Sequence, residues 1–79
     1  MRIKILGTGC KNCILLEKNV RKVVDEFNIK SDIEIITDID KILDYGVMMI
    51  PGLVINEQVY SSGKALSTIE IVGILKKIA

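Results

Sequence analysis

The chain has 79 residues, of which 49% are apolar, and its eleven basic and ten acidic side chains leave a net charge of +1. This length predicts one domain, over residues 1–79. The sequence has no basic tract and no basic–aromatic alternation, which argues against nucleic-acid binding. It also lacks an apolar run of about 18 residues, which argues against a membrane span. The N-terminal run is too short and too charged for a signal peptide, so we expect a cytoplasmic protein.

The first half of the chain predicts a strand, a helix and a second strand. Residues 2–6 are a short β-branched run that ends at Gly7-Thr8-Gly9. Apolar residues then recur every three or four positions over 11–28, which predicts a helix with one buried stripe. The predicted stripe consists of Leu16, Val20, Val23, Val24 and Phe27. A second β-rich run predicts a strand over 32–37.

The next segment predicts a short helix and a hairpin. Thr37 or Asp38 is suited to cap a helix that Gly46 closes. Two apolar runs follow, at 53–55 and 59–61. The polar residues between them predict a tight turn, because Asn tolerates the left-handed backbone that such a turn needs.

The last segment predicts a helix and completes the fold. Ser67 and Glu70 have the spacing of a capping box, which starts a helix that extends to about residue 78. Its buried side is predicted to consist of Ile69, Val72, Leu75 and Ile78. The order is then β-α-β-α-β-β-α, which predicts an α/β fold with a four-stranded mixed sheet and helices on both faces.

Both cysteines, Cys10 and Cys13, lie where the first strand passes into the first helix. The unpaired N–H groups and the positive dipole end of a helix stabilise an anion, and Lys11 adds a charge, so we expect the pKa of Cys10 to fall below about 8.5. Cys13 should lie deeper. Cys10 would then attack a disulfide of a partner, and Cys13 would attack Cys10, which leaves a Cys10–Cys13 disulfide and needs no cofactor.

A Cys-x-x-Cys pair also occurs in metal sites. A closed zinc site needs four ligands, and the chain has no histidine and no third cysteine, so we expect no resident metal. A soft-metal chaperone, which would hold Cu(I) or a shared zinc between Cys10 and Cys13, is the alternative function. A purely structural role for both cysteines also remains open.

Other residues lie near the cysteine pair, and Met48, Met49 and Pro51 among them have two interpretations each. Gly7 and Gly9 would let another protein approach closely. Met48 and Met49 would form either an adaptable docking surface or a half-buried loop. Pro51 is the one proline, and it would be either a trans proline at a strand start or a cis proline that turns the backbone of the preceding residue outward.

The element order, the Cys-x-x-Cys at the first helix start and the segment Tyr45–Ile55 (YGVMMIPGLVI) resemble the thioredoxin superfamily. In particular, the chain is similar to small thioredoxin-like, glutaredoxin-like redox-active disulfide proteins of archaea and bacteria. The resemblance implies a minimal thioredoxin-like fold and a thiol–disulfide oxidoreductase that reduces protein disulfides. Cys10 would be the nucleophile and Cys13 the resolving thiol, with Pro51 in the cis form facing them.

This interpretation gives a set of expected substrate-binding residues and partners. The substrate-binding residues would be Thr8, Gly9, Lys11, Met49, Ile50 and Pro51. The partners would be proteins that contain a disulfide and a reductase that supplies electrons. We expect the protein itself to be a monomer. Lys4 would assist proton transfer at Cys13 if it lay beneath the cysteine pair.

Overall fold

The computed structural model describes residues 1–78, and the predicted domain boundary at residue 79 lies outside the described residues. The elements are β1 (Arg2–Leu6), α1 (Lys11–Glu26), β2 (Asp32–Ile36), α2 (Ile39–Asp44), β3 (Gly52–Ile55), β4 (Gln58–Ser62) and α3 (Thr68–Ile78). The predicted α/β fold and its β-α-β-α-β-β-α order are confirmed. None of the helices within residues 1–78 has the length and apolar character needed to cross a membrane.

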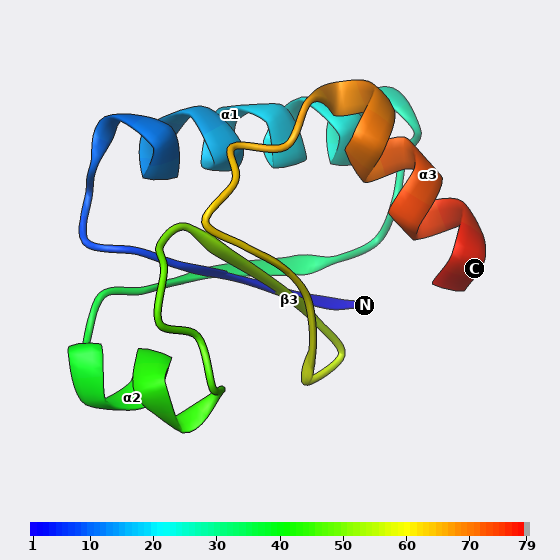
Figure 1. The fold of residues 1–79 in the computed structure, drawn as a ribbon. Coiled ribbons are helices and arrows are strands. Elements are labelled where there is room, and N and C mark those ends of the chain that lie inside the picture. The colour runs from blue at the N-terminus through cyan, green and yellow to red at the C-terminus, as the bar shows by residue number, and fades with distance from the viewer. Residues whose placement is uncertain (79) are drawn as a thin grey trace.

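The sheet has the strand order β2-β1-β3-β4. β1 pairs with β2 in parallel and with β3 in antiparallel orientation, and β3 and β4 form an antiparallel hairpin. Figure 1 shows that α1 and α3 cover one face of this sheet, whereas α2 lies on the other. The mixed sheet with helices on both faces is therefore as predicted.

Successive side chains of a strand point to opposite faces, and this alternation divides the apolar residues into two cores. The larger core lies between the sheet and the helices α1 and α3. It consists of Ile3, Ile5, Leu16, Val20, Val23, Leu53, Ile55, Leu66, Ile71 and Leu75. The smaller core lies on the side of α2 and consists of Leu6, Ile36, Ile42, Val47 and Val54.

The stripe predicted for the first helix is correct except at its end. Leu16, Val20 and Val23 are buried, and Val24 packs against the larger core. The prediction for Phe27 is wrong, because 57% of this residue is exposed. The helix ends at Glu26, so the backbone has left its helical path at Phe27 and the side chain no longer follows the stripe.

The capping box of α3 is confirmed, but one of its predicted core residues is not. The Glu70 N–H donates to Ser67 Oγ at 3.3 Å, and the Ser67 N–H donates to Glu70 Oε1 at 3.2 Å. Ile69 is 82% exposed, which corrects the prediction that it is buried. Ile71 and Leu75, four residues apart, lie on the buried side instead, and a residue two positions before Ile71 points to the opposite side of the helix.

The short helix and the hairpin are close to the prediction. Asp38, not Thr37, caps α2, and its side chain accepts a hydrogen bond from the Asp40 N–H at 2.9 Å. The β3–β4 turn consists of Asn56 and Glu57, which have φ values of 50° and 69°. Two such residues form a tight hairpin turn whose twist matches that of the strands. β4 therefore begins one residue earlier than predicted, at position 58.

Candidate active site

The two cysteines lie together at the N-terminal end of α1. Cys10 is the N-cap residue, Cys13 lies in the first turn, and a disulfide joins the two side chains. Their Cα atoms are 5.0 Å apart. The disulfide therefore lies at the start of α1, the helix that contributes the most side chains to the larger core.

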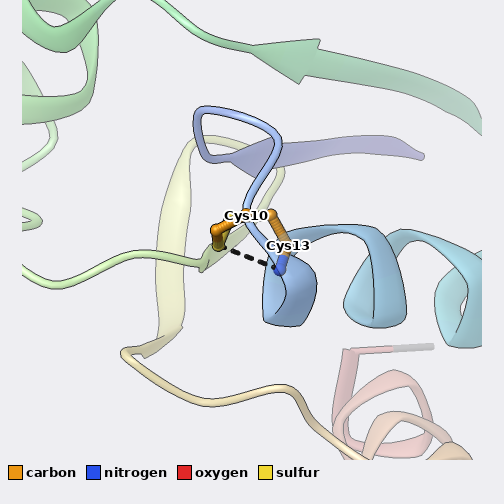
Figure 2. Close-up of a disulfide and its surroundings, with 2 residues drawn as sticks. All are labelled: Cys10 and Cys13. Atoms are coloured by element: carbon orange, nitrogen blue, oxygen red, sulfur yellow. Dashed lines mark hydrogen bonds between the residues drawn. A yellow bond between two sulfur atoms is a disulfide. The ribbon is translucent and has the colours of Figure 1, made fainter.

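Cys10 performs the task that a Ser, Thr, Asp or Asn oxygen performs at most helix starts. The Cys13 backbone N–H donates a hydrogen bond to Cys10 Sγ at 3.2 Å, which is the dashed line in Figure 2. The first turn of α1, which lies wholly within the described residues, contains no acidic side chain. The positive end of the helix therefore acts on Cys10 without a neighbouring carboxylate in that turn to offset it.

The two sulfurs differ in their access to solvent, as the sequence predicted. Cys13 is 5% exposed, whereas Cys10 is half-buried. The residue behind Cys13 is Gly7, which is itself buried, and a Cβ atom placed on Gly7 would lie 2.5 Å from Cys13 Sγ. The prediction that Gly7 leaves room for a partner is therefore wrong, because Cys13 occupies that room. Gly9 is exposed and has a φ of 86°.

The segment before β3 lies at the same end of the sheet as the cysteines. Leu6 of β1 pairs with Gly52 in antiparallel orientation. The next residue on each side is Gly7 and Pro51, so these two lie near each other. The Ile50–Pro51 peptide bond is cis. The Pro51 ring is fully buried, and its carbonyl oxygen accepts a hydrogen bond from the Gly63 N–H at 2.8 Å. A partner at this edge would therefore meet the residues just before the ring, not the ring itself.

The two methionines of this loop are the most open apolar side chains near the site. Met48 is 87% exposed and Met49 is 68% exposed, so the interpretation as a half-buried loop is wrong. Ile50 is half-buried and packs against the smaller core. The loop thus presents Met48 and Met49 to solvent, and Ile50 in part, beside Pro51.

Of the remaining predicted site residues, Thr8 and Gly9 lie in the connection between β1 and α1, and Lys11 is the first residue of α1. Thr8, Gly9 and Lys11 are all exposed and flank Cys10 along the chain. Within residues 1–78, the hydrogen bond found at Cys10 Sγ comes from Cys13, and Thr8 makes none to it. The six predicted substrate-binding residues therefore lie at one end of the sheet, in the loop before α1, at the first residue of α1 and in the loop before β3.

Lys4 does not lie beneath the cysteines. It points to the face of the sheet opposite α1, where its Nζ donates to Tyr45 Oη at 2.8 Å and to Glu57 Oε1 at 2.6 Å. Tyr45 Oη donates in turn to Glu57 Oε2 at 3.2 Å. The hydrogen bond to Glu57 raises the pKa of Lys4, and the same bond lowers the pKa of Glu57. Sequence reasoning missed this cluster, although a lysine alternating with apolar residues in a central strand was a signal of it.

The arrangement does not support the soft-metal alternative. Across residues 1–78, no three His, Cys, Asp or Glu side chains gather so that they could hold a metal ion.

A disulfide between Cys10 and Cys13 at the start of the first helix, in a small mixed α/β sheet, is typical of dithiol–disulfide domains. A family model described as a thioredoxin domain matches residues 1–76. The chain is 43% identical over 75 residues to a thioredoxin of Methanothermobacter thermautotrophicus. The aligned region covers 95% of this chain and 97% of the relative. It is also 36% identical over 69 residues to a thioredoxin of Methanocaldococcus jannaschii, and here the aligned region covers 87% of this chain and 79% of the relative.

The chain belongs to the thioredoxin family. Its activity class is that of a thiol–disulfide oxidoreductase, which agrees with the prediction made from the cysteine pair and the Tyr45–Ile55 segment.

Proposed function

We propose that this protein reduces disulfides in other proteins, with Cys10 as the attacking sulfur and Cys13 as the resolving sulfur. The observation that carries the proposal is the asymmetry of the pair. Cys10 is the more open sulfur and accepts the Cys13 N–H at 3.2 Å, whereas Cys13 is 5% exposed. A hydrogen bond to the sulfur and the helix dipole both favour the thiolate, which is the reactive form.

The first step begins with the reduced protein. The Cys10 thiolate attacks one sulfur of the partner's disulfide, so the Cys10–partner S–S bond forms as the partner's own S–S bond breaks. The partner's leaving sulfur departs as a thiolate and takes up a proton. The product is a mixed disulfide between the two proteins.

The second step releases the partner. Cys13 loses its proton and attacks Cys10 Sγ, so the Cys10–Cys13 bond forms and the second partner sulfur leaves as a thiolate. Two electrons have then passed from the protein to the partner. The partner's two thiolates become thiols by taking up two protons, one released by Cys13 and one from the solvent, which received the proton of Cys10 when its thiolate formed. A reductase or a small dithiol must return two electrons to complete the cycle.

The partner would bind along the two loops beside Cys10. Thr8, Gly9 and Lys11 supply one side, and Met49 and Ile50 supply the other. Among the hydrogen bonds of residues 1–78 outside the helices and strands, none uses the backbone of Ile50. These groups are suited to pair with an extended segment of the partner, and a flexible methionine adapts to varied side chains. Cytoplasmic location, action as a monomer and a protein reductase as electron donor belong to the same proposal.

The test is insulin reduction with dithiothreitol as the electron source, followed by turbidity as the insulin chains precipitate. Wild type should accelerate precipitation, and both Cys10→Ser and Cys13→Ser should abolish turnover. In a separate reaction that starts from the reduced variants with the dithiothreitol removed, Cys13→Ser should accumulate a mixed disulfide with insulin, visible on a non-reducing gel, whereas Cys10→Ser should accumulate none. A mixed disulfide that forms through Cys13 in Cys10→Ser, or wild type without activity, would contradict the proposal.

A further inference from the structure

Gly7 faces the resolving cysteine directly. It follows Ile3 and Ile5 on the strand face that α1 covers, so a side chain at residue 7 would point toward α1. An ideal Cβ on Gly7 would lie 2.5 Å from Cys13 Sγ and 3.0 Å from Cys13 Cβ. Contacts below about 3.0 Å do not occur between such atoms, so an alanine here forces something to move.

The surroundings of Gly7 leave little freedom to move. Its N–H donates to the Ile36 carbonyl oxygen at 2.9 Å, and the preceding Leu6 is paired with Gly52, so the backbone is held on two sides. Cys13 Sγ is one bond from a helix-borne Cβ and is also bonded to Cys10. A short side chain fixed at both ends has no flexible part that can yield.

The other glycines do not share this situation. A Cβ at Gly9 or Gly73 would meet nothing within 4 Å. At Gly52 and Gly63 the nearest atoms belong to aliphatic or methionine side chains at 3.2 Å. Among the six glycines, Gly7 is therefore the position at which an added methyl group would press on a sulfur.

We propose that Gly7 is a positioning residue for Cys13: the missing side chain at residue 7 forms the seat that Cys13 Sγ occupies when it is bonded to Cys10. The proposal rests on the proposed function, since it assigns Gly7 to the resolving step of the same cycle. Its role is to permit closure of the disulfide, and it does not touch the partner.

The direction of the effect follows from the two redox forms. In the disulfide, Cys13 Sγ is fixed by the bond to Cys10 and cannot leave its seat. In the dithiol, the Cys13 side chain is free to turn to another rotamer, which relieves the contact. A methyl group at residue 7 therefore disfavours the disulfide more than the dithiol. It also delays the attack of Cys13 on Cys10, because the attacking sulfur must reach the same seat.

The experiment compares Gly7→Ala with wild type in mixtures of reduced and oxidised dithiothreitol. In this equilibrium the protein's two thiols become a disulfide as oxidised dithiothreitol takes up two electrons and two protons. We expect the equilibrium constant for closing the Cys10–Cys13 bond to fall at least tenfold, which corresponds to a potential higher by about 30 mV for a two-electron couple. The mixed disulfide of Cys10 with insulin should also persist longer during turnover.

Ile71→Val is the matched control. It removes one methyl group from the larger core, at a residue that is 1% exposed on α3, and it should lower stability by about 1 kcal/mol without moving the potential. A Gly7→Ala potential equal to that of wild type would overturn the proposal. A shift of the same size in Ile71→Val would overturn it as well, because any loss of stability would then suffice.

A double variant covers the case in which Gly7→Ala folds poorly. Replacing Cys13 with alanine removes the sulfur that the new methyl group would meet. The stability lost through Gly7→Ala, measured by urea unfolding, should therefore be smaller in a Cys13→Ala background than in the oxidised protein, where the Cys10–Cys13 bond holds the sulfur in place. An equal loss in both backgrounds would overturn the proposal. Failure of the proposed function is distinguishable, because wild type itself would then show no reversible dithiol–disulfide couple.

Discussion

The two faces of the sheet are built differently. The face under α1 and α3 is covered by helices of 16 and 11 residues, which close a continuous apolar core. The opposite face is covered by α2, a helix of six residues. The smaller core lies on this face, and a polar cleft lies beside it. The lining of this cleft includes Lys4, Glu34, Lys41, Asp44, Tyr45 and Glu57.

The cysteine pair and the Met49–Ile50 loop rest on different cores. Cys13 belongs to the helix that the larger core anchors, so the sulfur pair has a rigid support. The loop with Met49 and Ile50 follows α2 and rests on the smaller core through Val47. Segments with few buried apolar contacts open more easily than the main core. The loop that we propose contacts partners therefore lies on the face with less packing, and the sulfurs lie on the face with more.

Truncation of one buried side chain on each face tests this contrast most strongly. Leu16→Ala should lower the free energy of unfolding by an amount in the upper part of the range of about 2–5 kcal/mol that such deletions cost, because α1 cannot shift to fill the cavity. Ile42→Ala should fall in the lower part, because short α2 can readjust. Both residues are at most 2% exposed, so burial is matched. Urea unfolding measures both values, and a larger loss for Ile42→Ala would contradict the contrast.

Lys4→Met should have a smaller effect than either core truncation. The lysine holds together the end of α2 and the β3–β4 turn through Tyr45 and Glu57, but the Glu57 side chain is 56% exposed. Ion pairs with an exposed member contribute little, and a methionine retains the apolar contacts of the lysine stem. We expect a small decrease in melting temperature, with the Cys10–Cys13 potential unchanged. A change in that potential would show that the cluster acts on the cysteines.

The acid side of the stability profile should respond to one carboxylate on each side of the sheet. The hydrogen bond from Lys4 lowers the pKa of Glu57, and the hydrogen bond from the Ser67 backbone lowers the pKa of Glu70. A carboxyl whose pKa is lowered by folding adds stability above its unfolded pKa of about 4.3, and this stability is lost as the pH falls through the lower folded value.

Glu57→Gln and Glu70→Gln should therefore each make the loss of stability below about pH 4 less steep than in wild type. The two carboxylates belong to separate hydrogen-bond networks, so their effects should add in the double variant. Urea unfolding at a series of pH values measures both slopes. An unchanged slope in a single variant would show that the carboxylate in question makes no such contribution.

Ile69→Ser should have the smallest effect of all. Ile69 is 82% exposed on the outer side of α3, so its replacement should change stability by no more than about 0.5 kcal/mol. Ile71→Ser, two residues along, buries a hydroxyl in the larger core and should be strongly destabilising. Thermal unfolding distinguishes the pair. Equal losses would mean that α3 presents a different side to the sheet.

Periodicity was sufficient to predict the elements, their order and most of the core, because a strand alternates every two residues and a helix returns every three to four. It failed at the helix ends, where one residue sets the phase: Phe27 lies just beyond α1, and the start of α3 places Ile71 inward in place of Ile69. Both errors concern positions that the apolar pattern alone leaves ambiguous.

The cysteine pair was predictable because the two residues that react with each other lie three positions apart in the sequence. The role of Gly7 was not, since the residue that fills its space lies six positions later on another element. The strand alternation of Ile3, Ile5 and Gly7 did indicate which face residue 7 occupies. The Lys4–Tyr45–Glu57 cluster joins β1, the end of α2 and the hairpin turn, and no local pattern connects these three.

The proposed reaction requires that Cys10 is the reactive sulfur and Cys13 the sheltered one. The direct measurement treats the fully reduced protein with a small amount of iodoacetamide over a range of pH and maps the modified cysteine by peptide mass spectrometry. We predict that Cys10 is alkylated first and that its reactivity rises with a midpoint below the value of about 8.5 for a free cysteine. Faster alkylation of Cys13, or equal rates with a midpoint near that of a free cysteine, would contradict the account.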